Sequence, residues 1–207
     1  MAETRNHLSP AEGIWSLRRL PDMDEAQFNQ WQTLLEHRTG ITLSSERKSF
    51  LETNLGIRMR EIGCSSYQAY YEKIVSGPDA VVEWSTLVDR LTVQETSFFR
   101  HPGSFALVED YLSQFAVERG TGATLNAWSV GCSTGEEAYS LAMLISERFR
   151  ADGKALLYGI TGTDISLPTL SKARRGLFPR RRVEQIDPAL RERYFQEADA
   201  HTMQVSD

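Results

Sequence analysis

Apolar residues recur at helical spacing in the first part of the chain. In the stretch after Asp22 the apolar positions lie three or four residues apart: Phe28, Trp31, Leu34 and Leu35. Asp22 or Asp24 is suited to cap the start, and Gly40 stands just past the end. This spacing, with a capping residue before it and a glycine after it, predicts an amphipathic helix.

The same kind of pattern predicts three more helices. The second begins at Ser44 or Ser45 and runs to Gly63, the third ends at Gly77, and the fourth follows Pro78. Their apolar positions are Leu51, Leu55, Met59 and Ile62, then Tyr67, Tyr70, Tyr71 and Ile74, then Val81, Val88 and Leu91. Residues 22–92 are therefore predicted to form an all-α domain. Residues 1–21 show no period and are predicted to be an N-terminal arm.

The pattern changes after residue 100. A helix-like stretch at 101–120 precedes the apolar run LNAWSV at 125–130, which reads as a buried strand. A glycine turn, a helix at 136–150 and a second apolar strand at 155–164 follow. Strand, turn, helix and strand in this order predict a βαβ unit with a parallel sheet. We expect a Rossmann-like α/β domain over residues 105–207, joined to the helical domain by a linker at 93–104.

Composition narrows the setting without naming a function. The chain has 207 residues, 41% hydrophobic and 25% charged, with a formal net charge of −5, which is typical of a globular protein and disfavours general nucleic-acid binding. We find no apolar run long enough to span a membrane and no secretory signal, so we expect a cytoplasmic protein. Two cysteines and four scattered histidines predict no disulfide framework and no metal site.

The candidate chemistry lies in GCSTGEE, Gly131 to Glu137, between the first strand and its helix. This position is where open parallel sheets bind ligands. The loop lacks G-x-G-x-x-G, and two glutamates beside a diphosphate would repel it. S-adenosylmethionine carries no phosphate and has a cationic amino-acid end, and Asp164 at the end of the second strand is placed to bind its ribose. An alternative is a capping box between Ser133 and Glu136, which stabilises a helix start without any ligand.

Three ordered motifs resemble the CheR family of chemoreceptor glutamate O-methyltransferases. They are LTVQETSFFRHP at 91–102, SVGCSTGEEAYSLAM at 129–143 and GTDISLPTLSKARRGLF at 162–178. The resemblance covers residues 22 to about 200. It implies a helical receptor-recognition domain, a domain that binds S-adenosylmethionine and leaves S-adenosylhomocysteine, and methyl transfer to glutamates of a chemoreceptor. A PilK-like branch that serves type IV pilus motility is a narrower expectation.

The resemblance assigns roles to individual residues. Asp164 is expected to bind the ribose, and Gly131 and Glu136 the methionine end. Gln94, Thr96 and Arg100 are expected to line the pocket, with Gln94 standing where the family usually has Asn. Arg100 is the candidate catalytic residue, because a guanidinium fork suits a substrate carboxylate, and a structural salt bridge is its alternative. The family meets its receptor with the helical domain, so Arg58 and Arg60 are candidate receptor contacts.

Several alternatives stay open. The basic run KARRGLFPRRR is either a solvated face or a receptor contact, and Phe98 and Phe99 are either core or adenine-stacking residues. From about residue 179 the chain resembles the start of the family's inserted subdomain. Since only two strands of the expected larger sheet are found, we expect these residues to be the N-terminal part of a longer methyltransferase. A non-catalytic binding module and a nucleotide-dependent oxidoreductase are the rival functions.

Overall fold

The computed structural model describes residues 22–119, 124–151, 153 and 157–206. The predicted N-terminal arm lies outside these residues. The chain splits into two compact units, Met1–Ala80 and Val81–Asp207. The domain boundaries predicted at residues 92 and 104 stay predictions. No helix in the described part of the chain is long and apolar enough to cross a membrane.

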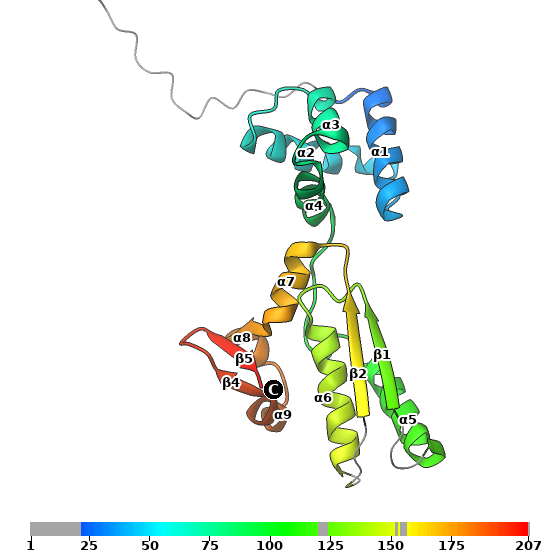
Figure 1. Cartoon of the computed structure of the whole chain (residues 1–207), viewed down its shortest axis with the longest axis vertical. Coiled ribbons are helices and arrows are strands. Elements are labelled where there is room, and N and C mark those ends of the chain that lie inside the picture. Colours follow the sequence, from blue (N-terminus) through cyan, green and yellow to red (C-terminus); the bar gives the residue numbers. More distant parts are fainter. Residues whose placement is uncertain (1–21, 120–123, 152, 154–156, 207) are drawn as a thin grey trace, which may run out of the picture. The chain divides into compact units, whose positions relative to one another are not determined.

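The described part of the first unit contains three α-helices and one short 3-10 helix (Figure 1). These are α1 (Glu25–Thr39), η1 (Ser45–Arg47), α2 (Lys48–Glu61) and α3 (Tyr67–Ser76). The capping residue of α1 is Asp24, whose side chain accepts from the Gln27 backbone N–H while Gln27 bonds back. Gly40 ends the helix in the left-handed conformation with φ of 74°. The sequence prediction of both ends of this helix is confirmed.

Buried aromatic and aliphatic side chains fill the interior of this unit. The Trp31 ring lies 5.6 Å from the Tyr70 ring and 5.3 Å from the Tyr71 ring, measured between centroids. The apolar positions that predicted the helices account for most of the buried set, which includes Phe28, Trp31, Leu35, Leu51, Leu55, Met59, Tyr70 and Ile74. The helical period therefore identified the core.

The second unit begins in α4 (Ala80–Leu91) and contains the expected βαβ unit. Its next elements are α5 (Pro102–Arg119), β1 (Thr124–Val130), α6 (Glu136–Ala151), β2 (Leu157–Thr163) and α7 (Leu167–Arg175). Strands β1 and β2 pair in parallel, with Val130 opposite Thr163 at their carboxyl ends. An all-α N-terminal part followed by an α/β part confirms the predicted fold class.

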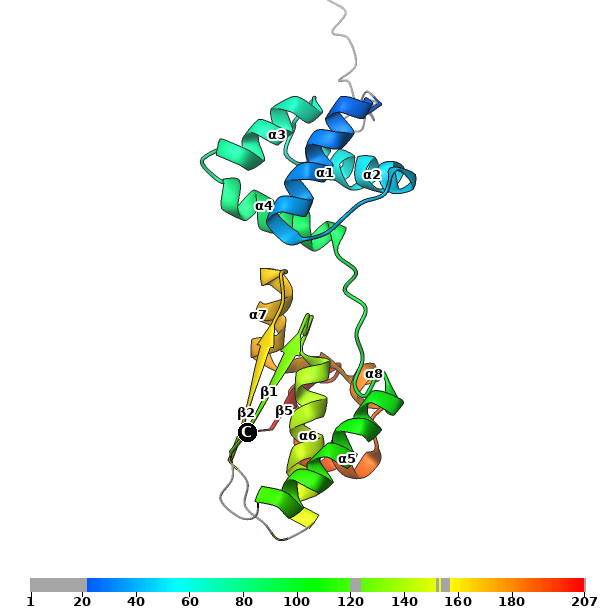
Figure 2. The same ribbon diagram turned by 90° about the vertical axis from the view of Figure 1, so that its right-hand side faces the viewer.

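Helices α5 and α6 cover one face of this two-stranded sheet (Figure 2). Leu125 and Ile160 of the sheet pack with a cluster from the two helices that contains Leu112, Ala116, Ile145 and Phe149. Alternate residues of β1 point the other way, and Trp128 and Val130 are each 67% exposed. Within the described residues, the second face of the sheet is therefore open to solvent.

The rest of the chain, residues 177–205, forms a small subdomain that we call the inserted subdomain (Figure 1). It consists of β3 (Leu177–Pro179), α8 (Arg180–Val183), α9 (Pro188–Tyr194), β4 (Phe195–Glu197) and β5 (Thr202–Val205), with antiparallel strand order β3-β5-β4. The sequence did not predict these three strands, because strands of three or four residues are too short to show an alternating pattern.

Candidate functional site

The glycine loop, Gly131 to Glu137, connects the end of β1 to the start of α6. The backbone N–H groups of Gly131 and Cys132 both donate to the Thr163 carbonyl, at 2.8 and 2.9 Å, which fixes the loop over the end of β2. Gly131 and Gly135 adopt positive φ angles of 72° and 98°. A side chain at Gly135 would lie 3.0 Å from the Ala173 side chain of α7, whereas at Gly131 nothing lies within 4 Å. Gly135 therefore permits close packing, and Gly131 leaves the backbone accessible.

Asp164 holds this loop from the end of β2. One of its carboxylate oxygens accepts from the Ser133 backbone N–H and the other from the Ser166 backbone N–H, both at 2.8 Å. Because Ser133 donates to Asp164, the capping box between Ser133 and Glu136 does not form. Each carboxylate oxygen has a second lone pair, so half-buried Asp164 keeps acceptor capacity for a ligand.

The two glutamates of the loop have different environments. Glu136 is fully buried, with 0% of its surface exposed, and its carboxylate accepts from the Thr134 hydroxyl at 2.5 Å and from the Arg182 guanidinium. Glu137 is exposed and accepts from the Ser129 hydroxyl at 2.6 Å. Without a ligand, the Glu136 side chain is enclosed by protein, and its expected contact with the methionine end stays a prediction. Of the two glutamates Glu137 is the accessible one, and the resemblance assigned no role to it.

The segment before α5 brings one of the predicted pocket residues, Gln94, to the loop. Gln94 accepts from the Ser133 hydroxyl at 3.2 Å, and its amide nitrogen donates to Thr92 at 2.7 Å. The Phe99 backbone N–H, at a positive φ of 50°, bonds the Ser140 hydroxyl of α6 at 3.0 Å. This bond fixes the segment that carries Thr96, whose side chain is half-buried.

Arg100 is exposed in this structure. Its guanidinium donates to the Glu95 carbonyl at 2.6 Å and lies 3.4 Å from the Glu95 carboxylate. This contact corresponds to the structural alternative, a local salt bridge. Exposed ion pairs are weak, so the pair leaves Arg100 able to exchange Glu95 for another carboxylate.

Phe98 belongs to the core. Its ring contacts Phe178 and Phe195 edge-on, with centroids 4.9 and 5.4 Å away. These rings join a cluster of buried residues from α6 and the inserted subdomain: Met143, Phe178, Val183, Ile186, Phe195 and Met203. The pocket-lining segment, α6 and the inserted subdomain therefore share one apolar core, and a stacking role for Phe98 is not supported.

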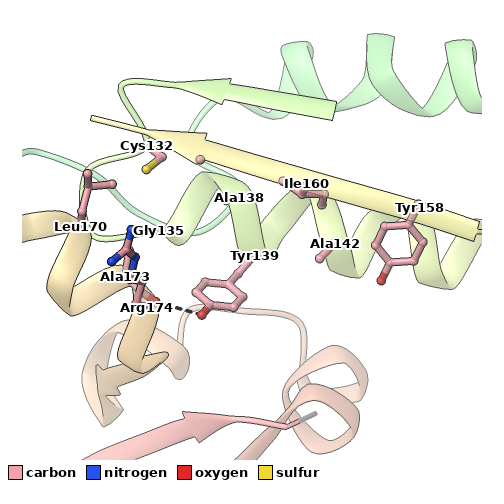
Figure 3. Close-up of a pocket in the computed structure, with 11 residues that line it drawn as sticks. Cys132, Gly135, Ala138, Tyr139, Ala142, Tyr158, Ile160, Leu170, Ala173 and Arg174 are labelled. Atoms are coloured by element: carbon pink, nitrogen blue, oxygen red, sulfur yellow. Dashed lines mark hydrogen bonds between the residues drawn. The ribbon is translucent and has the colours of Figure 1, made fainter. Parts of the chain in front are cut away.

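A cavity of about 330 Å³ lies between α6, β2 and α7 (Figure 3). Cys132, Tyr139, Ile160, Leu170 and Ala173 are among its lining residues, and the Tyr139 hydroxyl donates to the Ala173 carbonyl at 2.9 Å. Burial raises the pKa of the Cys132 thiol, and the nearby carboxylates of Asp164 and Glu137 raise it further. Cys132 is thus a packed, protonated thiol rather than a reactive one. Cys132 and Gly135 of the glycine loop line the cavity, but none of the residues to which the resemblance assigned a role does.

The two predicted receptor contacts, Arg58 and Arg60, lie in the first unit. Arg58 forms an ion pair with Glu61 at 3.0 Å on α2, and Arg60 is exposed on the same helix. Their receptor role stays a prediction. Among the described residues, no three histidine, cysteine or acidic side chains lie together as a metal site.

A charged cluster attaches the inserted subdomain to α6. The Glu147 carboxylate accepts from Arg150 and from the Tyr194 hydroxyl, both at 2.7 Å, and from Arg193. Chiefly through Arg150, these donors lower the pKa of Glu147 from 4.5 to about 2. Burial and the Glu147 carboxylate raise the pKa of Tyr194 to about 12.

Replacing Glu147 with glutamine is expected to destabilise the protein at neutral pH by about 1–2 kcal/mol, because the donors around Glu147 lose a charged acceptor. The loss is kept small by solvent, which screens this partly exposed site. The pKa of Glu147 is lower in the folded than in the unfolded state. Its contribution is therefore present above pH 4.5 and is lost as the pH falls toward about 2. Urea unfolding from pH 7 to about pH 3 measures this, with exposed Glu184→Gln as the control. A difference between variant and wild type that did not shrink at low pH would contradict the assignment.

The structure places a glycine loop at the carboxyl ends of two parallel strands in an α/β domain, and this is the position at which such sheets bind their ligands. Residues 94–207 match the family described as CheR methyltransferase, SAM binding domain, and residues 26–92 match CheR methyltransferase, all-alpha domain. The chain therefore belongs to the CheR methyltransferase family.

Individual relatives agree with this assignment. The chain is 28% identical over 174 residues to the chemotaxis protein methyltransferase of Escherichia coli, which covers 84% of this chain and 57% of that protein. It is 31% identical over 168 residues to chemotaxis protein methyltransferase 2 of Pseudomonas aeruginosa, with 81% and 57% covered. A probable biofilm formation methyltransferase, WspC of Pseudomonas putida, is 30% identical over 177 residues, with 86% and 40% covered. The chain thus spans little more than half the length of the chemotaxis relatives.

Proposed function

We propose that the glycine loop and Asp164 bind S-adenosylmethionine, and that the protein transfers its methyl group to glutamate side chains of a chemoreceptor. The observation that carries the proposal is the joint position of Asp164, Ser133 and Gln94 at the carboxyl ends of β1 and β2, linked by hydrogen bonds of 2.8 and 3.2 Å. The family match supports the choice of cofactor.

The residues present fit such a cofactor. Asp164 keeps lone pairs for two ribose hydroxyls, and exposed Glu137 offers a carboxylate to an ammonium group. Gly131 has open space where a side chain would lie, which allows a ligand to approach the backbone. Because Arg182 neutralises Glu136, only Glu137 would repel a diphosphate, and this repulsion is weaker than that of the two glutamates in the sequence.

The proposed reaction asks little acid or base chemistry of the protein. When bound, S-adenosylmethionine supplies a methyl group on a positively charged sulfur. A receptor glutamate, with a reference pKa near 4.3, is already an anion at neutral pH and needs no general base. The protein contributes alignment and exclusion of water, which are worth on the order of 7–11 kcal/mol when the geometry is favourable. Arg100 is the proposed holder of the substrate carboxylate, after exchange with Glu95.

The wider setting belongs to the same proposal. The partner is the cytoplasmic helical region of a methyl-accepting receptor, met through the helical domain at Arg58 and Arg60, in the cytoplasm and without nucleic acid. Chemotaxis is the proposed signalling system, following the names of the relatives. The PilK-like pilus branch stays a prediction.

Transfer of a labelled methyl group from S-adenosylmethionine to purified receptor cytoplasmic helices tests the proposal. We expect transfer that is lost when the receptor's glutamates are replaced with alanine. Binding of S-adenosylhomocysteine without any transfer would favour the alternative, a non-catalytic binding module of the same family. The observation that favours this alternative is the solvent-exposed face of the β1-β2 sheet.

A further inference from the structure

Glu136 poses a physical problem that its own loop does not solve. A carboxylate with 0% exposure is strongly destabilising unless it is paired and hydrogen-bonded. Thr134, from the same loop, supplies one hydroxyl donor at 2.5 Å. The compensating positive charge comes from Arg182, which lies 46 residues further along the chain. The start of α6 therefore depends on a residue outside the βαβ unit.

Arg182 reaches Glu136 from the inserted subdomain. It lies on α8, and the next residue, Val183, has 0% exposure in the apolar core shared with Phe178 and Phe195. Burial of Val183 holds α8 in place and so orients the Arg182 guanidinium toward Glu136. The Arg182 side chain is 38% exposed, so the pair lies at the boundary between interior and solvent.

Beyond the backbone bonds of Gly131 and Cys132 to Thr163, three contacts hold the middle of the glycine loop, residues 133–136. Asp164 binds the Ser133 backbone N–H, and Gln94 binds the Ser133 hydroxyl. The third contact is the chain of Arg182, Glu136 and Thr134. Ser133 itself has a positive φ of 49°, which is costly for a residue with a side chain and persists only where the surroundings enforce it. Removing one of the three contacts should therefore release the loop.

We propose that Arg182 is a positioning residue, which acts through Glu136 and Thr134 to hold the glycine loop in its ligand-binding conformation. The inserted subdomain thereby sets the cofactor affinity of the domain. This role differs from both roles that the basic run suggested, a solvated face or a receptor contact. The inference deepens the proposed function, and only its ligand-binding readout rests on that function.

Hydrogen exchange of the full chain without ligand tests the positioning role. In Arg182→Gln, backbone amides of residues 131–137 should exchange at least about tenfold faster than in wild type, a change equivalent to about 1.4 kcal/mol. Arg181→Gln, the exposed neighbour on the same helix, is the matched control and should leave these amides unchanged. Arg182→Lys keeps the charge and should restore most of the protection.

Two results would overturn the proposal without reference to any ligand. One is equal exchange at 131–137 in Arg182→Gln and Arg181→Gln. The other is a loss of protection that spreads equally to the β3 and β5 amides, which would show that Arg182 only supports the inserted subdomain.

A double-mutant cycle measures the route of the effect. Arg182→Gln should weaken S-adenosylhomocysteine binding by about tenfold in wild type and by less than about twofold in a Glu136→Gln background, where no buried charge needs a partner. Equal losses in both backgrounds would contradict a route through Glu136. Wild-type protein that failed to bind S-adenosylhomocysteine would count against the proposed function alone, because the exchange comparison decides the positioning role without it.

Discussion

The Asp164→Ala variant is expected to bind S-adenosylhomocysteine at least about tenfold more weakly than wild type, a loss of about 1.4 kcal/mol or more. The proposed contacts with both ribose hydroxyls are charge-assisted and disappear together. The variant also loses the acceptor that holds the Ser133 backbone N–H at 2.8 Å, so the loop itself becomes less ordered. Both effects act on affinity in the same direction.

Titration calorimetry measures this loss, and circular dichroism checks the fold. Asp199→Ala is a matched control, because Asp199 likewise accepts from two backbone N–H groups, those of His201 and Thr202, but in the turn of the inserted subdomain. Its affinity should equal that of wild type. A folded Asp164→Ala protein with unchanged affinity would remove Asp164 from the binding site.

The largest expected loss of stability follows from replacing Phe178 with alanine. Phe178 is 2% exposed, and its ring contacts those of Phe98, Tyr139 and Phe195, with centroids 4.9, 5.6 and 6.4 Å away. Truncating a buried phenylalanine typically costs about 3–5 kcal/mol. Because Phe98 belongs to the segment of Thr96 and Arg100, the loss should also disorder the pocket-lining residues.

Urea unfolding compares this variant with Leu177→Ala, its neighbour on β3, which is 41% exposed. The control should lose less than about 1 kcal/mol, since little apolar surface is withdrawn from water at that position. Equal losses in the two variants would show that the shared core does not support the inserted subdomain.

Local signals were sufficient to predict the longer helices and the two strands of the βαβ unit. The capping side chain of Asp24, the left-handed Gly40 and the helical period together located α1, and two apolar runs separated by a turn and a helix located β1 and β2. In each case the determining interactions lie within a few residues along the chain. The glycine turn that contains Gly135 could also be predicted, but the packing of Gly135 against Ala173 of α7 could not.

Contacts between distant segments were not predictable in this way. Nothing local distinguishes Arg182 from Arg181, yet one pairs with buried Glu136 and the other is exposed. The choice between Glu136 and Glu137 as the accessible carboxylate depends on that same pairing. The strands β3, β4 and β5 are short, and they exist because the apolar core beneath them is shared with Phe98 and α6.

We expect the carboxyl end of the β1-β2 sheet to bind an S-adenosyl compound. Calorimetric titration of the wild-type chain with S-adenosylhomocysteine, and separately with NAD, tests it directly. We expect saturable binding of S-adenosylhomocysteine and no heat of binding with NAD, because the loop lacks a diphosphate cradle and presents the Glu137 carboxylate instead. Saturable binding of NAD without binding of S-adenosylhomocysteine would contradict the account and favour an oxidoreductase.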